Sequence, residues 1–318
     1  MIRLSAIGSA LGRKSEVTRL PLSQESLARL GAGRVRAYSD AGGATLVAMA
    51  GRAVRASLAC GHVDPASIDA VVLCTSSYWH HRQLNPRALS SALCELGLER
   101  AQLFLTSVPG CHNAVTGLRL ARGLLRSEGL QRVLVCTCDV AAGDAHRLGD
   151  GPSVLGDGAA CCLLSTDPGE GYALLGLERS DRHVMSRHAD DGAGRQLLGA
   201  EWLGEVASVT SRLLRRHGVA PAQLALLAPN NYNDGLRATL AQVVGVPLDK
   251  TVPFDEHTGH VWSSDPFLAL TRHGADRLYG GDHALLLSTG PYYFGAALLS
   301  RLAPWTQGGA TACPASTA

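Results

Sequence analysis

The sequence predicts an α/β fold in which buried strands alternate with helices. Short apolar runs of strand length recur along the chain, and segments with the 3.6-residue spacing of amphipathic helices lie between them. This alternation is typical of an α/β architecture whose strands are largely buried. The composition indicates an ordered chain, because 46% of the 318 residues are hydrophobic, only 18% are charged and 36 are glycines. A chain of this kind folds compactly, with elements that approach closely.

The first half of the chain contains most of the clearest strand signals. Apolar runs predict strands at 1–7, 68–75, 101–106 and 132–137, and helical spacing predicts helices at 85–99 and 113–129. The second half repeats this style. Strands are expected at 174–179, 224–228 and 283–289, and helices at 198–217, 236–244 and 266–273. We therefore expect two similar halves, 1–166 and 167–318, joined around 165–171.

Charge and hydropathy argue against several partners. The net charge is only +2, and no long basic run favours nucleic acid. The cluster of Arg212, Arg215 and Arg216 is interpreted as the solvated face of one helix. No stretch approaches the 18 apolar residues of a membrane span, and the first residues resemble a strand more than a signal peptide. The expected protein is cytoplasmic, with neither a membrane nor a nucleic acid as partner.

Most of the nine cysteines are expected to be packing residues. Apolar surroundings predict small buried hydrophobes at seven positions, namely Cys60, Cys74, Cys94, Cys136, Cys138, Cys161 and Cys162. Their spacing does not match paired zinc ligands, so no metal site is expected. Cys313 lies in a Gly/Ala/Pro/Ser/Thr-rich tail that is expected to be mobile.

Cys111 stands in a different setting. The strand at 101–106 is followed by a Pro109-Gly110 turn, and Cys111 then opens the helix at 113–129. A helix N-terminus carries roughly +0.5 charge and unsatisfied N–H groups, which lower a thiol pKa and stabilise an oxyanion. These features favour a nucleophilic cysteine that attacks a thioester. The alternative is a buried structural cysteine.

Four segments together resemble the ketoacyl synthase III branch of the thiolase superfamily. They are the Cys111 segment, Leu155-Gly-Asp-Gly-Ala-Ala160, the loop and helix at 259–270, and Ser288-Thr-Gly-Pro-Tyr-Tyr-Phe-Gly295. Their order and spacing extend the resemblance over roughly 29–299. It implies a thiolase fold with five layers, α-β-α-β-α, built from two duplicated halves. It also implies a homodimer without a bound cofactor, whose acyl groups arrive on coenzyme A or an acyl carrier protein.

The resemblance assigns a catalytic role to Cys111 and an oxyanion hole to the N–H groups of Cys111 and Gly290. The sequence departs from the family pattern at the other two catalytic positions. Asn230, in Ala-Pro-Asn-Asn-Tyr-Asn, stands where the family has His, and His260 follows Gly259 where the family has Asn. The two residue types are exchanged.

This exchange changes the expected chemistry. Asn230 and a neutral His260 still provide two N–H donors, as a condensing enzyme needs. His260 is also suited to accept the proton of Cys111, and then that of an acceptor hydroxyl or amine. Members of this branch with a displaced His are known as acyltransferases, and others as condensing enzymes. Asp265, Asp255 and Glu256 are all candidates for orienting His260.

Four further residues are candidates for binding substrate. Trp262 and Tyr232 are bulky where the family has small residues, so they reshape a substrate channel or simply pack in the core. His112 lines the pocket, although adjacent helical residues point apart and direct pairing with Cys111 is not expected. Arg29 lies near the position of an arginine that contacts coenzyme A, and an exposed salt bridge is the alternative.

Three more histidines are candidates for a role. His257 precedes His260 by three residues, but with no third ligand evident it is expected to be a loop residue and not part of a metal site. His80 and His81 fall where the family has a loop near the dimer interface and the substrate tunnel.

The leading hypothesis is a ping-pong acyltransferase of specialised biosynthesis. Cys111 takes the acyl group, His260 acts as general base, and Asn230 is a hydrogen-bonding partner. The acceptor is a small-molecule alcohol or amine. The alternative is a Claisen condensation that forms a carbon–carbon bond. A non-catalytic partner subunit is disfavoured, because such partners usually lose the nucleophile that this chain keeps.

Overall fold

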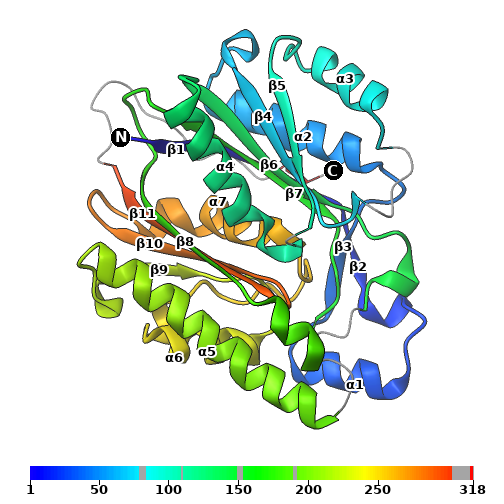
Figure 1. Ribbon diagram of the computed structural model, residues 1–318. Coiled ribbons are helices and arrows are strands. Elements are labelled where there is room, and N and C mark those ends of the chain that lie inside the picture. The colour runs from blue at the N-terminus through cyan, green and yellow to red at the C-terminus, as the bar shows by residue number, and fades with distance from the viewer. Residues whose placement is uncertain (79–83, 109, 149–152, 189–191, 303–315, 318) are drawn as a thin grey trace.

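The computed structural model describes residues 1–78, 84–108, 110–148, 153–188, 192–302 and 316–317 (Figure 1). Its main sheet contains β1 (Arg3–Leu11), β4 (Ala70–Cys74), β5 (Gln102–Thr106), β6 (Arg132–Asp139), β7 (Gly158–Ser165), β8 (Tyr172–Asp181), β9 (Leu224–Ala228), β10 (His283–Thr289), β11 (Tyr293–Arg301) and the short β12 (Ser316–Thr317). The helices are α1 (Gln24–Ala32), α2 (Leu46–Cys60), α3 (Pro86–Glu95), α4 (Asn113–Ser127), α5 (Gly192–Arg216), α6 (Asp234–Val244) and α7 (Asp265–Arg277).

The sheet consists of two halves with the same strand pattern. Its order is β5-β4-β6-β7-β1-β8-β11-β10-β9, and the halves meet where the start of β1 pairs with the start of β8. In the first half β4 is parallel to β6, and β7 and β1 follow antiparallel. In the second half β9 is parallel to β10, and β11 and β8 follow antiparallel. The expected junction at 165–171 falls between β7 and β8.

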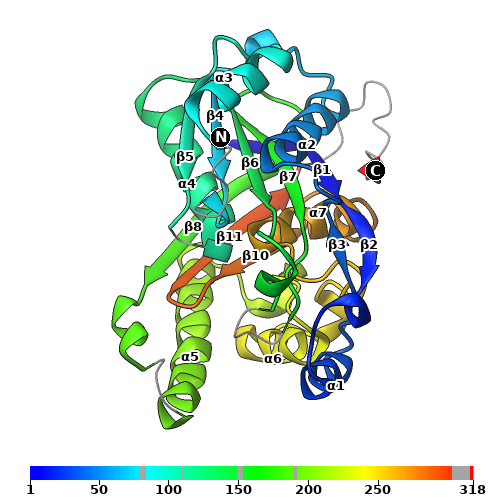
Figure 2. The same cartoon turned by 90° about the vertical axis from the view of Figure 1, so that its right-hand side faces the viewer.

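Helices cover both faces of this arrangement and also fill its middle. In Figures 1 and 2, α4 and α7 lie between the two halves of the sheet, with α2 and α3 outside one half and α5 and α6 outside the other. The contacts agree: α4 packs on β6 and on β11, while α7 packs on β9, β1 and β7. The predicted five-layer α-β-α-β-α fold is therefore confirmed.

The two central helices are buried because small and apolar residues let the sheets approach them. At Gly117 of α4, an added Cβ would lie 2.6 Å from the Cys74 sulfur and 2.8 Å from Val135 Cγ1, so a larger residue does not fit. In α7, Phe267 is fully buried. Since α4 and α7 are equivalent in the two halves, their N-terminal ends meet, and the segments η4 (Gly110–His112) and η9 (Trp262–Ser264) come into contact there.

Several sequence expectations needed correction. The helix expected at 85–99 ends at Glu95, because Gly97 adopts a left-handed φ of +71°. Cys94 is exposed and Cys60 is half-buried, since α3 and the end of α2 each leave one side open to solvent. The other five cysteines expected in the core are buried, and Cys313 lies outside the described residues.

A small second sheet, β2 (Arg13–Glu16) with β3 (Ala37–Asp40), and the neighbouring α1 were not predicted. Within the described part of the chain, no helix is both long and apolar enough to cross a membrane.

Candidate active site

Cys111 lies at a sharp turn between β5 and α4. The backbone is left-handed at Gly110 (φ +60°). Cys111 was expected to open the helix, but it lies in the 3-10 segment η4, and α4 begins two residues later, at Asn113. The Asn113 side chain donates to the Ser107 carbonyl (3.1 Å), which ties the helix start to the strand end. Ser288 Oγ donates to the Cys111 carbonyl (2.8 Å). The half-buried thiol is thus held on a fixed backbone.

Cys111, His260 and Asp265 form a hydrogen-bonded chain. His260 Nε2 lies 3.0 Å from Cys111 Sγ, and His260 Nδ1 lies 2.5 Å from Asp265 Oδ2. Asp265 is therefore the carboxylate that orients the imidazole. The other two candidates have different partners, since Asp255 pairs with Arg272 and Glu256 pairs with Arg36 at 2.9 Å. The arrangement has the geometry of a nucleophile, a base and an orienting acid.

Backbone groups hold Asp265 in place at the first position of α7. The Val261 N–H donates to Oδ1 (2.8 Å) and the Asn231 N–H donates to Oδ2 (2.7 Å). The side chain of Asn231 in turn donates to the carbonyls of Asp255 (2.9 Å) and Gly259 (2.8 Å). Asn231 thus fixes both Asp265 and the loop that leads to His260. Sequence reasoning missed it, because its partners come from two distant segments.

The surroundings of His260 favour its protonated form. Burial lowers the pKa of this imidazole, but the Cys111 sulfur, as an anion, and the Asp265 carboxylate raise it more, and the result is about 10. The imidazole therefore holds a proton strongly where it faces the Cys111 sulfur. Asp265 also selects the tautomer, since its carboxylate accepts from Nδ1–H and leaves Nε2 to face the thiol.

Asn230 lies in the same cluster but has structural partners. Its Nδ2 donates to the Trp262 carbonyl (2.9 Å), and its Oδ1 accepts from the Thr289 N–H (2.8 Å). The buried amide therefore connects the end of β9, segment η9 and the end of β10. It holds together the three segments that surround His260.

Gly290 does not present the donor that the sequence predicted. Its N–H donates to the Tyr293 carbonyl (2.8 Å), as the bond that closes the tight turn between β10 and β11. A backbone amide has one hydrogen, so in this conformation Gly290 N–H is not offered to an acyl oxygen. Its carbonyl accepts from the indole N–H of Trp202 (3.0 Å).

Aromatic rings surround His260. The Tyr232 ring centroid lies 4.5 Å from that of His260, and the Trp262 centroid lies 6.5 Å from it. Tyr232 donates its hydroxyl to the Thr289 carbonyl (2.8 Å), and burial raises its pKa well above the usual value, so it stays neutral. Trp202 packs edge-on against Tyr232 at 6.5 Å. No sequence signal pointed to Trp202, which reaches the site from α5.

His112 is buried beside the end of β10. Its Nδ1 donates to the Ser288 carbonyl (2.9 Å), and burial lowers its pKa to about 4, so the ring is neutral. It lies against Gly295, where an added Cβ would be only 1.9 Å from the ring. Arg29, the fourth proposed substrate-binding residue, is exposed in the last turn of α1, and the structure does not bring it into this cluster.

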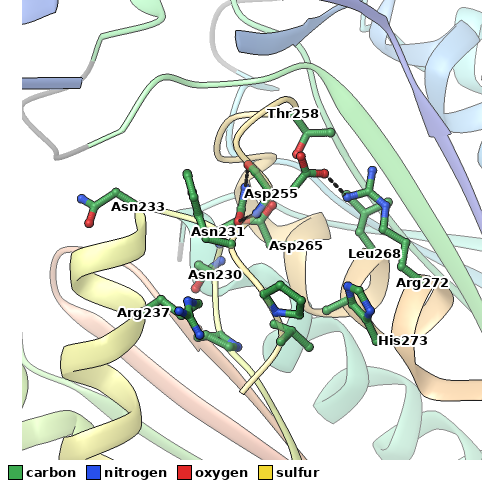
Figure 3. A pocket seen from close by; sticks show the side chains of 15 residues that line it. Asn230, Asn231, Asn233, Arg237, Asp255, Thr258, Asp265, Leu268, Arg272 and His273 are labelled. Carbon is green, nitrogen blue, oxygen red and sulfur yellow. Dashed lines mark hydrogen bonds and ion pairs between the residues drawn. The ribbon is translucent and has the colours of Figure 1, made fainter. Parts of the chain in front are cut away.

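A small cavity borders the site on the side of α6 and α7 (Figure 3). Asn230, Asn231 and Asp265 line it, together with Asp255 and its partner Arg272. Its volume of about 40 Å³ admits only a few water molecules, which is too little for an acyl chain.

Other polar candidates do not add a metal centre. His257 is exposed beside Glu256, and the described residues contain no group of three or more His, Cys, Asp or Glu side chains arranged to hold a metal ion. His80 and His81 lie outside the described residues.

Comparison with known proteins agrees with this architecture, which defines a thiolase-fold protein. A family model described as 3-oxoacyl-[acyl-carrier-protein (ACP)] synthase III matches residues 108–182. The β-ketoacyl-[acyl-carrier-protein] synthase III of Streptomyces lividans is 30% identical over 280 residues, which cover 80% of each protein. The chain therefore belongs to the 3-oxoacyl-[acyl-carrier-protein] synthase III family of enzymes.

Two further similarities extend the comparison. The β-ketoacyl-[acyl-carrier-protein] synthase III of Roseiflexus castenholzii is 28% identical over 277 residues, which cover 80% of this chain and 82% of that protein. Among solved structures, one named as the acyltransferase ChlB3 has the same fold, with a TM-score of 0.80 at 21% identity over 95% of this chain and 98% of that chain.

Proposed function

We propose that this protein is an acyltransferase. It moves an acyl group from coenzyme A or an acyl carrier protein, through a thioester on Cys111, to the oxygen or nitrogen of a small-molecule acceptor in specialised biosynthesis. The chain from Cys111 Sγ through His260 to the Asp265 carboxylate is the observation that carries this proposal. It provides a nucleophile and an oriented general base in one site.

In the first half-reaction, Cys111 becomes acylated. His260 Nε2 takes the thiol proton, and the sulfur attacks the donor carbonyl, whose π electrons move to oxygen. When that tetrahedral species collapses, the bond to the donor sulfur breaks and the leaving thiolate takes the proton from His260. Because Asp265 accepts from Nδ1–H, the imidazole keeps its orientation during both transfers.

Acylation then prepares His260 for the second half-reaction. The Cys111 anion is the largest of the influences that raise the pKa of His260. Once this sulfur is bonded to the acyl carbon, that charge is gone and the imidazole loses its proton more readily. A neutral His260 can then deprotonate an incoming hydroxyl or amine, which attacks the acyl-thioester and releases Cys111.

The partners of Asn230 support transfer over condensation. A decarboxylating condensation needs two neutral donors to hold the carbonyl on which an enolate develops. One N–H of Asn230 Nδ2 donates to Trp262 and its Oδ1 accepts from Thr289, so this amide holds the loops around His260 and keeps only one N–H for a substrate carbonyl. His260, with a carboxylate at Nδ1, is suited to accept protons.

Intact-mass spectrometry with a panel of acyl thioesters tests the proposal. The wild-type protein should gain one acyl mass, Cys111→Ala should gain none, and an added acceptor should remove the label as an ester or amide. An acyl adduct on Cys111→Ala, or a labelled enzyme that no alcohol or amine discharges, would contradict it.

A Claisen condensation is the second candidate, and the names of the relatives favour it. The proteins from Streptomyces lividans and Roseiflexus castenholzii are both named as β-ketoacyl-[acyl-carrier-protein] synthases III. This function predicts carbon dioxide release when the acyl-enzyme meets a malonyl thioester. Release of carbon dioxide with a 3-oxoacyl product would decide for it.

We further propose that two copies pair through the edge formed by β5. β5 ends the order of the sheet, and Leu103 and Leu105 on it are 36% and 39% exposed. An open strand edge with apolar side chains is a ready surface for pairing with a second strand. In Figure 2, β5 lies beside α4, which follows the cysteine turn, so pairing here would bring the second copy near the site.

A further inference from the structure

Attack on a thioester places negative charge on the carbonyl oxygen, and enzymes stabilise that charge with fixed N–H donors. Two polar groups near Cys111 already have protein partners. The Gly290 N–H donates to Tyr293, and the Asn230 amide uses its oxygen for Thr289 and one of its two N–H groups for Trp262. A site with this chemistry needs a donor besides the Cys111 backbone N–H.

The indole N–H of Trp262 is a donor without a partner. Trp262 Nε1 is buried and has no hydrogen-bond partner among the described residues. A buried unsatisfied donor costs free energy, and in a native protein it calls for a partner that arrives from outside. The other indole near the site, that of Trp202, is satisfied by the Gly290 carbonyl at 3.0 Å.

The backbone of Trp262 is held in an unusual conformation. Its φ of +48° lies in the left-handed region, which is a genuine outlier for so bulky a residue. The Asn230 side chain donates to its carbonyl at 2.9 Å, and the preceding residue, Val261, donates its N–H to Asp265. Strain that neighbours enforce in this way is typical of functional sites.

Trp262 is linked to the Cys111 sulfur through His260. Its ring centroid is 6.5 Å from that of His260, with the two planes inclined by 31°. His260 Nε2 is in turn 3.0 Å from Cys111 Sγ. Trp262 is therefore a neighbour of the residue that contacts the sulfur.

We propose that Trp262 is a catalytic residue whose Nε1–H donates to the acyl carbonyl oxygen at Cys111. The inference rests on the proposed acyl-enzyme and concerns the step in which it forms. As the carbon–sulfur bond forms, the π pair of the carbonyl moves to oxygen, and the indole N–H binds that oxygen. The pair returns when the donor thiolate leaves, and Trp262 neither gains nor loses a proton. Asn230 acts through Trp262, as the positioning residue that holds its backbone.

Trp262→Phe tests this role, because it removes the N–H and keeps an aromatic ring. Two reactions of Cys111 are compared: acylation by a thioester, which develops an oxyanion, and alkylation by iodoacetamide, in which the attacked carbon bears no developing oxyanion. Both are followed by mass spectrometry of the peptide that contains Cys111. We expect acylation to slow by about a hundredfold, the usual effect of losing one oxyanion donor, and alkylation to keep the wild-type rate.

Trp202→Phe is the matched control, because it removes an indole N–H that already has a protein acceptor. It should not slow acylation selectively. The inference is overturned if Trp262→Phe acylates at the wild-type rate, or if acylation and alkylation fall together, as a structural role predicts. Slowing of transfer to the acceptor alone would also overturn it. A wild-type protein that no thioester acylates contradicts the proposed function itself, and this inference with it.

Discussion

At the scale of single residues, the reactivity of Cys111 depends on where its proton goes. A thiol attacks a thioester only as the thiolate, and His260 Nε2 stands 3.0 Å away to take the proton. Asp265 then determines whether that imidazole is basic and correctly turned. The carboxylate holds Nδ1–H and is itself held by two backbone N–H groups, so the orientation of His260 is set by α7 and by the end of β9.

Replacing the carboxylate should disable this arrangement. Asp265→Asn keeps the size of the side chain but removes the charge that raises the pKa of His260 and selects its tautomer. We expect the acylation rate of Cys111 at pH 7 to fall by about 10³–10⁴-fold, measured by stopped-time intact-mass spectrometry. Asp255→Asn, which removes a neighbouring carboxylate paired with Arg272, is the control and should acylate normally. Equal rates for the two variants would exclude Asp265 from the role.

The charge on the sulfur should be visible in the titration of His260. With free Cys111 the pKa of His260 is about 10, and the sulfur anion is the largest influence that raises it. Alkylation of Cys111 removes that anion, so the imidazole should lose its proton at a lower pH than in the untreated protein. NMR titration of ¹⁵N-labelled histidine measures this shift. The ring of His112, with a pKa of about 4, should stay neutral throughout and provides an internal reference. An unchanged pKa of His260 after alkylation would be evidence against the ion pair.

At the scale of elements, the ends of strands carry the site and also one buried acid. Asp139, the last residue of β6, accepts from the N–H groups of Ser76 and Ser77 at 2.5 and 2.9 Å, and Ser263 of η9 donates to it at 3.4 Å. It joins the loop after β4 to the segment beside His260. Burial raises its pKa to about 7 in the fold, from 3.8.

This raised pKa makes the fold sensitive to pH. The protonated acid stabilises the folded state fully below about pH 3.8, and that contribution is lost as the pH rises through 7. Asp139→Asn resembles the protonated form at every pH. Between pH 5 and 7, the free energy of unfolding of the wild type should fall relative to that of the variant by at most about 1.4 kcal/mol per pH unit. Denaturant unfolding of both proteins from pH 5 to 8 measures the difference, and a gap that does not change with pH would refute the prediction.

The contact between η4 and β11 requires a residue without a side chain at position 295. An added Cβ at Gly295 would lie 1.9 Å from the His112 ring. Gly295→Ala should therefore lower the free energy of unfolding by about 1–3 kcal/mol, the usual cost of overpacking. Since His112→Ala empties the same space, the double variant should lose less than the sum of the two single variants. Urea unfolding of the four proteins gives the coupling, and strictly additive losses would show that the two positions do not compete.

At the scale of the whole molecule, the duplication of the fold creates the site. α4 and α7 occupy equivalent positions in the two halves, and their N-terminal ends meet between the sheets. One end carries Cys111, and the other carries His260 and Asp265. Neither half therefore contains the chain from Cys111 to Asp265 without the other.

The proposed pairing through β5 is tested at the same scale. Leu105→Glu places a carboxylate on the exposed edge, where an unpaired buried charge costs about 3–5 kcal/mol. The variant should shift from dimer to monomer in analytical ultracentrifugation, with the dissociation constant raised by a hundredfold or more on that basis. Leu175→Glu alters a similarly exposed leucine, 37% against 39%, on β8 and should leave the dimer intact. A wild-type monomer, or a dimer that survives Leu105→Glu, would disprove the interface.

Local pattern was enough to predict much of the fold. The runs at 224–228 and 283–289 are strands with the expected limits, because their apolar residues are buried on both faces. The small sheet of β2 and β3 was not predicted, because its residues are mostly polar. The register of the two strands, in which Arg13 lies opposite Asp40, is set only by the tertiary fold. For the site, the sequence indicated Cys111 and His260, because a thiol and an imidazole can be recognised as candidates from the residue type alone.

What remained open from the sequence depended on contacts between distant segments. Sequence alone placed a candidate nucleophilic cysteine at a turn before a helix, with a histidine where the family has asparagine. Only the tertiary structure selected Asp265 from three acids, turned Gly290 N–H toward Tyr293 and left the Trp262 indole without a partner. The reason is geometric: a hydrogen bond requires its atoms to lie within about 3 Å, and that proximity is set by the packing of both halves of the chain.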